Sequence, residues 1–391
     1  MRYLFFVAVL PLVSPARLLL PAPNAVVVPN RYIVTLKRND TQSALQAAVR
    51  RIEESNIGHV YDVGEFRGFS ATLDNATLWD LQNNNAVESI EPDTTFSTAL
   101  FAVQNPANWN LARISHHNRS SSPKYIYDSS AGANTCVYII DTGIYINHTD
   151  FQDRAFAIAN FSPENDVDDN HGHGTHVAGT VGSAAYGVAK NASLLAVKVF
   201  GASGTGAASD VVAGIAFAAN DYASVNRSQC AKGGVANLSI SGPYTEALNA
   251  AVKAAVEKGL FMAVAAGNNG QNAANHSAGS VEEACAVGAT DANDVRAWFS
   301  NFGPSLDIWA PGVGILSTWN TGPNATKTLD GTSMAAPHVA GLAAYLTALE
   351  GERSPIDLCK RIQQISTKDL VTNIDNTNSV NDLAYNNNEV C

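Results

Sequence analysis

Short apolar segments alternate with longer helical segments between residues 136 and 350 of this chain. The short segments have the length and composition of buried strands; they span 136–140, 193–200, 234–240 and 260–265. The longer segments have the length of helices; they span 174–185, 209–222, 245–258 and 333–350. Because strands that alternate with helices form a parallel sheet covered on both faces, the pattern predicts a doubly wound, mostly parallel α/β domain.

A different pattern precedes residue 101. Residues 42–55 carry apolar side chains at helical spacing, and three segments have the alternation or composition of strands, namely 31–36, 68–73 and 87–92. This combination predicts a small α+β unit that is separate from the α/β domain. We therefore divide the chain into a leader, the α+β unit and the α/β domain, over residues 1–16, 17–101 and 102–391.

The N-terminus has the pattern of a secretory leader. An apolar stretch runs from Leu4 to Val13 after Arg2, is too short to span a bilayer, and is followed by a cleavage site near Ala16. We expect a secreted, extracellular protein and a monomer. No later segment is apolar for long enough to cross a membrane. A net charge of −11 without basic clusters argues against nucleic acid or a membrane surface as a partner.

One serine near the C-terminus stands where a turn enters a helix. Gly331-Thr332-Ser333 precedes a long alanine-rich stretch, and Gly331 permits a sharp bend. The first turn of a helix has unpaired N–H groups and a positive dipole end, beside which negative charge can develop. By itself this segment is more typical of an ordinary helix cap, so other residues have to decide its role.

Two further side chains supply what a nucleophilic serine needs. Asp141 follows the apolar strand 136–140, and His173 begins a helix of small residues after an acidic loop. A histidine can accept the proton of a serine hydroxyl, and an aspartate can hold the imidazole in the required tautomer. The combination of the three residues indicates an activated Ser333.

The segments IIDTGI, HGHGTHVAGT and GTSMAAPHVAGLAAYL resemble the active-site blocks of the subtilisin-like serine peptidases, and of the proteinase K and fungal alkaline (cuticle-degrading) group in particular. The resemblance also includes WNLARIS, AAGNNG and LDIWAPG. It implies a subtilisin-like fold and a serine endopeptidase without a catalytic cofactor. Within it, Asp141 orients the base, His173 is the general base and acid, and Ser333 is the nucleophile.

The same resemblance assigns groups around the reacting bond. Asn268, in AAGNNG, corresponds to the asparagine that donates its side-chain N–H to the tetrahedral intermediate. Protein and peptide substrates are expected to lie along Gly204, Thr205, Gly206, Ser239, Ile240, Ser241 and Gly267. The chain departs from the family at several pocket positions, which leaves selectivity open; these are His171, Ala208, Ser241, His276 and Ala278.

The α+β unit resembles the inhibitor-like propeptide of this family, which assists folding and blocks the cleft until it is removed. The alignment of the segment from Ala102 to Arg113 with the mature start of proteinase K places processing after Phe101. If the enzyme cleaves itself there, Phe101 must fit the primary specificity pocket. We therefore expect a preference for aromatic or large aliphatic residues before the scissile bond. A stable accessory domain is the alternative interpretation.

Five cysteines in an exported chain favour disulfide formation, and the sequence alone allows several connectivities. The resemblance pairs Cys136 with Cys230 and Cys285 with Cys359. Cys391, the last residue, is then left without a partner, and its fate stays open.

The family commonly holds a structural Ca²⁺ ion with a carboxylate and backbone carbonyl groups. By position, Asp307 would supply the carboxylate here, and Glu282 and Ala284 would supply the carbonyl oxygens. An aspartate beside a strand is also a common turn residue, so the resemblance alone carries this expectation.

Eight Asn-x-Ser/Thr sequons make the exported chain a candidate glycoprotein; they begin at Asn118, Asn147, Asn160, Asn191, Asn226, Asn237, Asn275 and Asn324. Asn237 lies on a predicted strand, so we expect it to be unmodified. The Asn-rich tail from Asn373 to Asn388 is expected to be loosely ordered.

Two other functions compete with the peptidase. His171, His173 and His176 could form the metal site of a metallohydrolase, because histidine triplets bind zinc. That interpretation leaves Ser333 and Asn268 without a role. A non-catalytic binding protein on a peptidase scaffold is the second rival, and the complete set of reactive residues argues against it.

Overall fold

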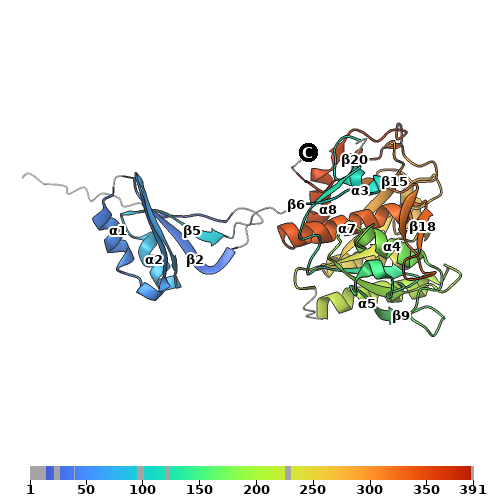
Figure 1. Cartoon of the computed structure of the whole chain (residues 1–391), viewed down its shortest axis with the longest axis horizontal. Helices are drawn as coiled ribbons and strands as arrows, with labels where there is room; N and C mark the ends of the chain where they lie inside the picture. Colours follow the sequence, from blue (N-terminus) through green and yellow to red (C-terminus); the bar gives the residue numbers. More distant parts are fainter. Residues whose placement is uncertain are drawn as a thin grey trace, which may run out of the picture. The chain divides into compact units, whose positions relative to one another are not determined.

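The computed structural model describes residues 15–21, 27–38, 40–94, 101–119, 123–224 and 230–388. The chain divides into two compact units, Met1–Thr98 and Ala99–Cys391 (Figure 1). The proposed leader up to residue 14, Asn226 and Cys391 lie outside the described residues. None of the helices in the described ranges is long and apolar enough to cross a membrane.

The N-terminal unit is a five-stranded sheet with two helices. The strand order is β1-β5-β2-β4-β3, with bounds Arg17–Leu18, Val87–Thr94, Val27–Leu36, Phe66–Thr72 and Ile57–Val63. The helices are α1 (Gln42–Val49) and α2 (Asn75–Gln82), and Glu54–Asn56 forms the short helix η1. The hydrophobic pattern does not predict β3, because most of this edge strand is exposed and its apolar residues do not mark a buried face.

The second unit contains a nine-stranded sheet in the order β19-β20-β16-β15-β13-β11-β8-β10-β9. The strands are β8 (Cys136–Asp141), β9 (Ala155–Asn160), β10 (Ser193–Lys198), β11 (Gly234–Leu238), β13 (Phe261–Ala265), β15 (Cys285–Thr290), β16 (Ile308–Pro311), β19 (Thr367–Lys368) and β20 (Asp382–Leu383). All neighbouring pairs are parallel except β19 with β20. The predicted mostly parallel sheet is confirmed.

Helices cover both faces of this sheet. They are α3 (Trp109–Ile114), α4 (His173–Gly182), α5 (Ala208–Ser224), α6 (Glu246–Glu257), α7 (Thr332–Glu350) and α8 (Pro355–Ile365). Alternate residues of β8 enter two different cores, since Val137 and Ile139 pack with α4 and α7, whereas Tyr138 and Ile140 pack with α5 and α6. Figure 1 shows α7 and α4 lying beside each other in this unit. The doubly wound prediction is therefore confirmed.

Short antiparallel ladders complete the second unit. They pair β6 (Phe101–Gln104) with β7 (Tyr125–Asp128), β12 (Gly242–Pro243) with β14 (His276–Ser277), and β17 (Ile315–Thr318) with β18 (Thr326–Leu329). Two short helices, η2 (Thr149–Phe151) and η4 (Ala273–Asn275), lie in loops.

The expectation of a loosely ordered Asn-rich tail is wrong. Asn386 and Asn388 are fully buried, and their amides donate to the carbonyl oxygens of Ile126 and Ser115 at 2.7 and 2.5 Å. Other asparagines of the tail have positive φ, which asparagine tolerates better than most residues; these are Asn373, Asn376, Asn378 and Asn387. The composition that suggested disorder supplies turn formers and backbone-pairing amides instead.

Candidate active site

The first turn of α4 places a histidine against the end of β8. Asp141, the last residue of β8, is fully buried, whereas the side chain of His173 is 22% exposed. The Nδ1 atom of His173 lies 2.7 Å from Oδ1 of Asp141, and the amide of Thr142 donates to the same oxygen at 2.8 Å. A carboxylate in this place can hold a proton on Nδ1, which leaves Nε2 as the basic atom.

Burial and charge act on His173 in opposite directions. Burial lowers its pKa, but the charge of Asp141, the hydrogen bond to it and the charge of Asp169 outweigh burial, so that the pKa is raised above the ordinary value of 6.5. Asp169 is itself buried, and it accepts from the Thr142 and Thr175 hydroxyls at 2.8 and 2.6 Å. The environment therefore stabilises the imidazolium that forms when His173 accepts a proton.

Ser333 lies in the first turn of α7, and hydrogen bonds join it to the residue after β11. Its hydroxyl donates to the carbonyl oxygen of Ser239 at 3.0 Å, and the hydroxyl of Ser239 donates to the carbonyl oxygen of Ser333 at 2.8 Å. The Asn237 amide donates to the Ser239 hydroxyl at 2.8 Å. Gly331, at the N-terminal boundary of α7, has φ of 151°, at the edge of the region that favours glycine.

Thr332 orients the side chain of Asn268. Its backbone N–H and its hydroxyl each donate to Oδ1 of Asn268 at 2.8 Å. Because the oxygen is engaged, the Nδ2 group of Asn268 is the donor that remains for a ligand in the cleft. The sequence does not predict this role for Thr332, and its position directly before Ser333 is the only sequence signal for it.

A single cavity of about 300 Å³ brings the predicted residues together. Its lining consists of Thr142, His171, His173, Phe200, Gly204, Ser239, Ile240, Ser241, Asn268, Asn269 and Ser333. Thr205 and Gly206 are exposed, and the Gly267 amide donates to the Thr332 hydroxyl at 3.1 Å. Thr142, Phe200 and Asn269 are lining residues that the sequence motifs do not indicate, although each lies within four residues after a strand.

The departures from the family lie at defined places. A Cβ atom on Gly267 would come within 2.7 Å of the Ser241 hydroxyl, so this hydroxyl occupies the space beside the glycine. Ala208 is exposed at the start of α5, and Ala278 is buried. The His276 ring contacts the side-chain oxygen of Gln271 at 3.2 Å.

The contacts of His176 argue against a histidine metal site. It is fully buried, and its Nε2 atom lies 3.0 Å from the carbonyl oxygens of both Ile315 and Lys327. Since a carbonyl oxygen accepts, Nε2 must carry the hydrogen and cannot bind a metal. Burial lowers the pKa of His176 to about 4, so that the ring stays neutral near neutral pH.

Two disulfides join described residues of the second unit. Cys136 is bonded to Cys230 and Cys285 to Cys359, the pairs that the resemblance implies. Among the described residues, the group of side chains close enough to hold a metal is Cys285, Asp307 and Cys359. Because its cysteines are oxidised, this group offers only one carboxylate and no thiolate ligand.

Asp307 has the environment of a carboxylate that lacks a counter-charge. Burial raises its pKa to about 7, although the Ala286 amide donates to it at 2.8 Å and opposes the rise. The charge of Glu282 adds to the increase. A cation bound at the Asp307 carboxylate would offset the cost of partly burying its charge.

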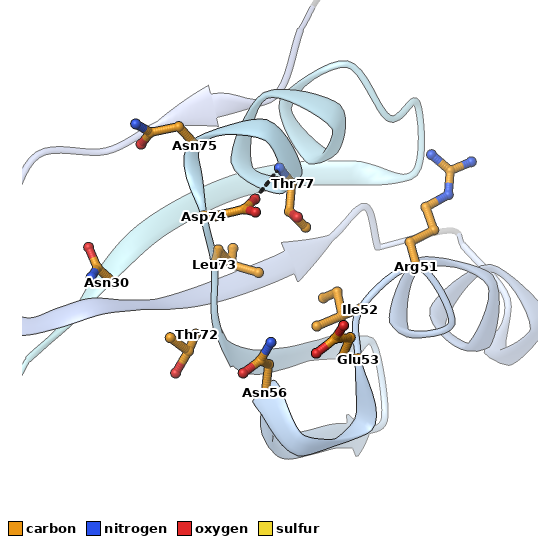
Figure 2. Close-up of a pocket in the computed structure, with 10 residues that line it drawn as sticks. All are labelled: Asn30, Arg51, Ile52, Glu53, Asn56, Thr72, Leu73, Asp74, Asn75 and Thr77. Carbon is orange, nitrogen blue, oxygen red and sulfur yellow. Dashed lines mark hydrogen bonds between the residues drawn. The ribbon is translucent and has the colours of Figure 1, made fainter.

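A larger hollow of about 690 Å³ lies in the N-terminal unit, far from this chemistry in sequence (Figure 2). Its lining includes Asp74, whose carboxylate caps α2 by accepting from the Thr77 amide at 2.8 Å. The lining residues that the structure describes contain no histidine, cysteine or serine. Size alone therefore does not identify the functional site of this chain.

Two family models match the chain, and several known proteins are similar to it. The Subtilase family matches residues 132–382, and Peptidase inhibitor I9 matches residues 31–99. The chain is 46% identical to alkaline serine protease ver112 of Corniculantispora psalliotae, with 99% of both chains covered. It is 43% identical to the cuticle-degrading protease of Metarhizium anisopliae, over 95% of this chain and 93% of that protein. The chain is also similar to the solved structure of a cold adapted subtilisin-like serine proteinase, with 36% sequence identity and a TM-score of 0.66. The match covers 72% of this chain and 98% of that protein.

Proposed function

The chain belongs to the subtilase family of serine peptidases and carries an inhibitor-type propeptide, and from this premise we propose that it is a secreted endopeptidase that forms an acyl-enzyme on Ser333. The observation that carries the proposal is the 2.7 Å contact between Asp141 and His173 in the same cleft as Ser333 and Asn268.

The first half of the reaction forms the acyl-enzyme. The Ser333 hydroxyl turns from the Ser239 carbonyl oxygen toward His173, whose Nε2 accepts its proton while Oγ bonds to the substrate carbonyl carbon. The Nδ2 group of Asn268 and the amide of Ser333 donate to the oxyanion. His173 then gives the proton to the leaving amine as the C–N bond breaks. The second half repeats these steps with water as the nucleophile, and releases the acid.

An acylating reagent directed at serine tests the chemistry. We expect it to abolish activity and to add its acyl mass to the peptide that contains Ser333, whereas a metal chelator should leave the labelling unchanged. Labelling elsewhere with loss of activity would contradict the assignment of Ser333.

We propose that processing follows Phe101 and is autocatalytic. Phe101 begins β6 and is paired with Asp128 of β7, so this segment has to leave the ladder before it can enter the cleft. Thr98, Ala99 and Leu100 lie outside the described residues. The Ser333→Ala variant should accumulate as the unprocessed chain. If it is processed after residue 101 with no other peptidase present, self-cleavage is wrong.

The processing site sets the expected specificity. An enzyme that cleaves after Phe101 must accept an aromatic side chain in the pocket beside Ser239, Ile240 and Ser241. We expect peptides with phenylalanine or leucine before the scissile bond to be cleaved best. A strong preference for arginine or lysine there would refute this specificity.

We propose a structural Ca²⁺ ion at Asp307, with the carbonyl groups of Glu282 and Ala284 as further ligands. The half-buried carboxylate and its raised pKa support the site, since a hard cation prefers oxygen ligands. Calcium should raise the Tm of the wild type and not that of Asp307→Asn. An equal Tm with calcium and with chelator in the wild type would reject the site.

Glycosylation is proposed for the described sequons whose asparagines are exposed, namely Asn118, Asn147, Asn191, Asn275 and Asn324. Asn237 is fully buried, and the Asn160 amide donates to the carbonyl oxygens of Glu164 and Asp166, so these two are proposed to stay unmodified. Peptide mass mapping of the exported protein before and after deglycosylation tests the assignment.

A further inference from the structure

The turn that follows β10 connects Asp141 with the edge of the cavity. The amide of Phe200 donates to the carbonyl oxygen of Asp141 at 3.3 Å, and the amide of Gly204 donates to the carbonyl oxygen of Gly201 at 2.9 Å. Phe200 and Gly204 line the active-site cavity. We call residues 200–204 the cleft turn, because the path of its main chain sets one edge of the cleft.

A side chain from a different loop contacts the main chain of the cleft turn. Glu164 lies in the loop between β9 and α4, and its Oε1 atom accepts from the amide of Ala202 at 2.6 Å. A Cβ atom on Gly201 would come within 2.5 Å of the same oxygen, so the carboxylate lies directly against this glycine. Because both contacts are with main-chain atoms, Glu164 fixes the path of the cleft turn.

The second oxygen of this carboxylate is held from below. Oε2 lies 2.9 Å from Nζ of Lys198, the last residue of β10, and it accepts from the amide of Asn170 at 3.2 Å. The Lys198 side chain is fully buried, and a buried ammonium needs a charged partner, so the ion pair fixes the carboxylate. Nζ of Lys198 also donates to the carbonyl oxygen of Asp168 at 2.5 Å. Glu164 therefore joins the end of β10, the cleft turn and the loop that leads to His173.

The same contacts keep Glu164 ionised. The Ala202 amide, Lys198 and Asn170 lower the pKa of Glu164 to about 2, so the carboxylate is charged at neutral and alkaline pH. A charged carboxylate is a stronger acceptor for an amide than a neutral group. Asp166 carries the same charge in the same loop, 3.7 Å from Lys198, but it has no hydrogen bond to the cleft turn among the described residues. The contact with Ala202, and not charge alone, sets Glu164 apart.

The cleft turn leads into Gly204–Gly206, along which the backbone of an extended substrate is expected to pair. Such pairing needs main-chain donors and acceptors in fixed places. A peptide that extends several residues before the scissile bond would use this segment. A substrate that ends one residue before the reacting bond would not reach it. This step rests on the proposed peptidase function and on the substrate pairing it implies.

We propose that Glu164 is a positioning residue that acts through the main chain of the cleft turn and sets how well the enzyme uses extended peptides. The juxtaposition that carries this is one carboxylate with the Ala202 amide on one oxygen and the buried Lys198 ammonium on the other. Glu164 does not line the cavity, so we expect the chemical steps at Ser333 to be unaffected.

The test compares two substrates on wild type and variants, all matured by the same unrelated peptidase and repurified. One substrate is a peptide that extends several residues before the scissile bond and has phenylalanine next to it, and the other is an ester of acetyl-phenylalanine. In Glu164→Ala, kcat/KM for the peptide should fall about tenfold, the effect of weakening one or two main-chain hydrogen bonds, whereas kcat/KM for the ester should change by less than about twofold. Glu164→Gln keeps an oxygen acceptor for the Ala202 amide and should recover most of the loss.

Asp166→Ala is the matched control, because it removes the same charge from the same loop and leaves the cleft turn untouched. It should leave the peptide-to-ester ratio unchanged. Glu164→Ala deprives the buried Lys198 of its nearest carboxylate, so a second variant combines Lys198→Met with Glu164→Met. This double variant has neither the buried ammonium nor an acceptor for Ala202, and it should show the same fall in the ratio.

Cleavage of the ester shows that a variant folds and keeps its reactive residues in place. An unchanged ratio in the Glu164 variants that cleave the ester would overturn the proposal, and so would an equal fall in Asp166→Ala. Loss of ester cleavage in both Glu164→Ala and the double variant would also overturn it, because Glu164 would then support the fold as a whole. If the wild type cleaves neither substrate, the proposed peptidase function fails instead.

Discussion

Two histidines on successive turns of α4 have pKa values shifted in opposite directions. His173 opens α4, faces the cleft and has its pKa raised, because Asp141 outweighs the effect of burial. His176 lies one turn later, is fully buried and has its pKa lowered to about 4, because burial prevails and two carbonyl oxygens fix its hydrogen. The difference shows that a neighbouring carboxylate, rather than the local sequence, separates a proposed base from a structural histidine.

Removing each imidazole gives the largest contrast. His173→Ala should lower kcat by about 10⁶, as loss of the corresponding histidine does in subtilisin, because no base remains for Ser333. His176→Gln should change kcat little in protein that folds, because Nε2–H of His176 is a donor to carbonyl groups that glutamine can imitate in part. Because a variant without the base should not process itself, both variants are matured by an unrelated peptidase and repurified, and steady-state kinetics then measure kcat of each. A comparable loss of kcat in the two variants would remove the distinction.

Asp141→Asn should have the next largest effect. An asparagine can hold the imidazole in the wrong tautomer, and the expected loss in kcat is about 10⁴. The pH profile gives a separate readout. In the wild type the base must be neutral, so kcat/KM should be lost as pH falls through the raised pKa of His173, above 6.5. An acid limb below 6.5 in the wild type would contradict the stated balance of burial and charge.

Asn268→Ala should cost about 10²–10³ in kcat, because one donor to the oxyanion is removed while the Ser333 amide remains. KM should change less than kcat, since the donor acts mainly on the transition state. Asn272→Ala is a useful control, because Asn272 caps the short helix η4 and does not line the cleft. A similar loss in both variants would indicate a structural effect of the loop.

The smallest predicted effect concerns the stability of the folded chain, and it tests the environment of the buried His176. The unfolded chain binds a proton at His176 below pH 6.5, whereas the folded chain does so only below about 4. Stability should therefore be lost as pH falls through this window, by about 3 kcal/mol from this residue at most. Urea unfolding between these pH values, in wild type and His176→Gln, measures the difference. An identical pH dependence would show that His176 does not contribute.

His338 acts in the same direction, so part of the pH dependence should remain in His176→Gln. It is fully buried, and its pKa is also lowered to about 4 by burial. Its Nδ1 atom lies 2.8 Å from the Met334 carbonyl oxygen, within the helix that carries Ser333.

The α/β core could be predicted because its strands are continuous apolar runs. The strands β10, β11 and β13 lie within the predicted segments, and β8 extends one residue beyond its segment, to Asp141. The small unit was predicted less well, since its edge strand β3 has mostly exposed residues. The Asn-rich tail was predicted wrongly, because burial of Asn386 and Asn388 depends on carbonyl groups of Ile126 and Ser115, which are distant in sequence.

The order of apolar strands and helices, and the motifs around Asp141, His173, Asn268 and Ser333, were determined by the sequence itself, because they are local and contiguous. Only the tertiary structure decided how those residues are used. In the folded chain, Thr332 donates to the side-chain oxygen of Asn268, and the Ser333 hydroxyl donates to the carbonyl oxygen of Ser239. His176 is buried, whereas His171 lines the cavity. Hydrogen-bond partners and burial arise between segments far apart in the chain, and they set the chemistry of each side chain.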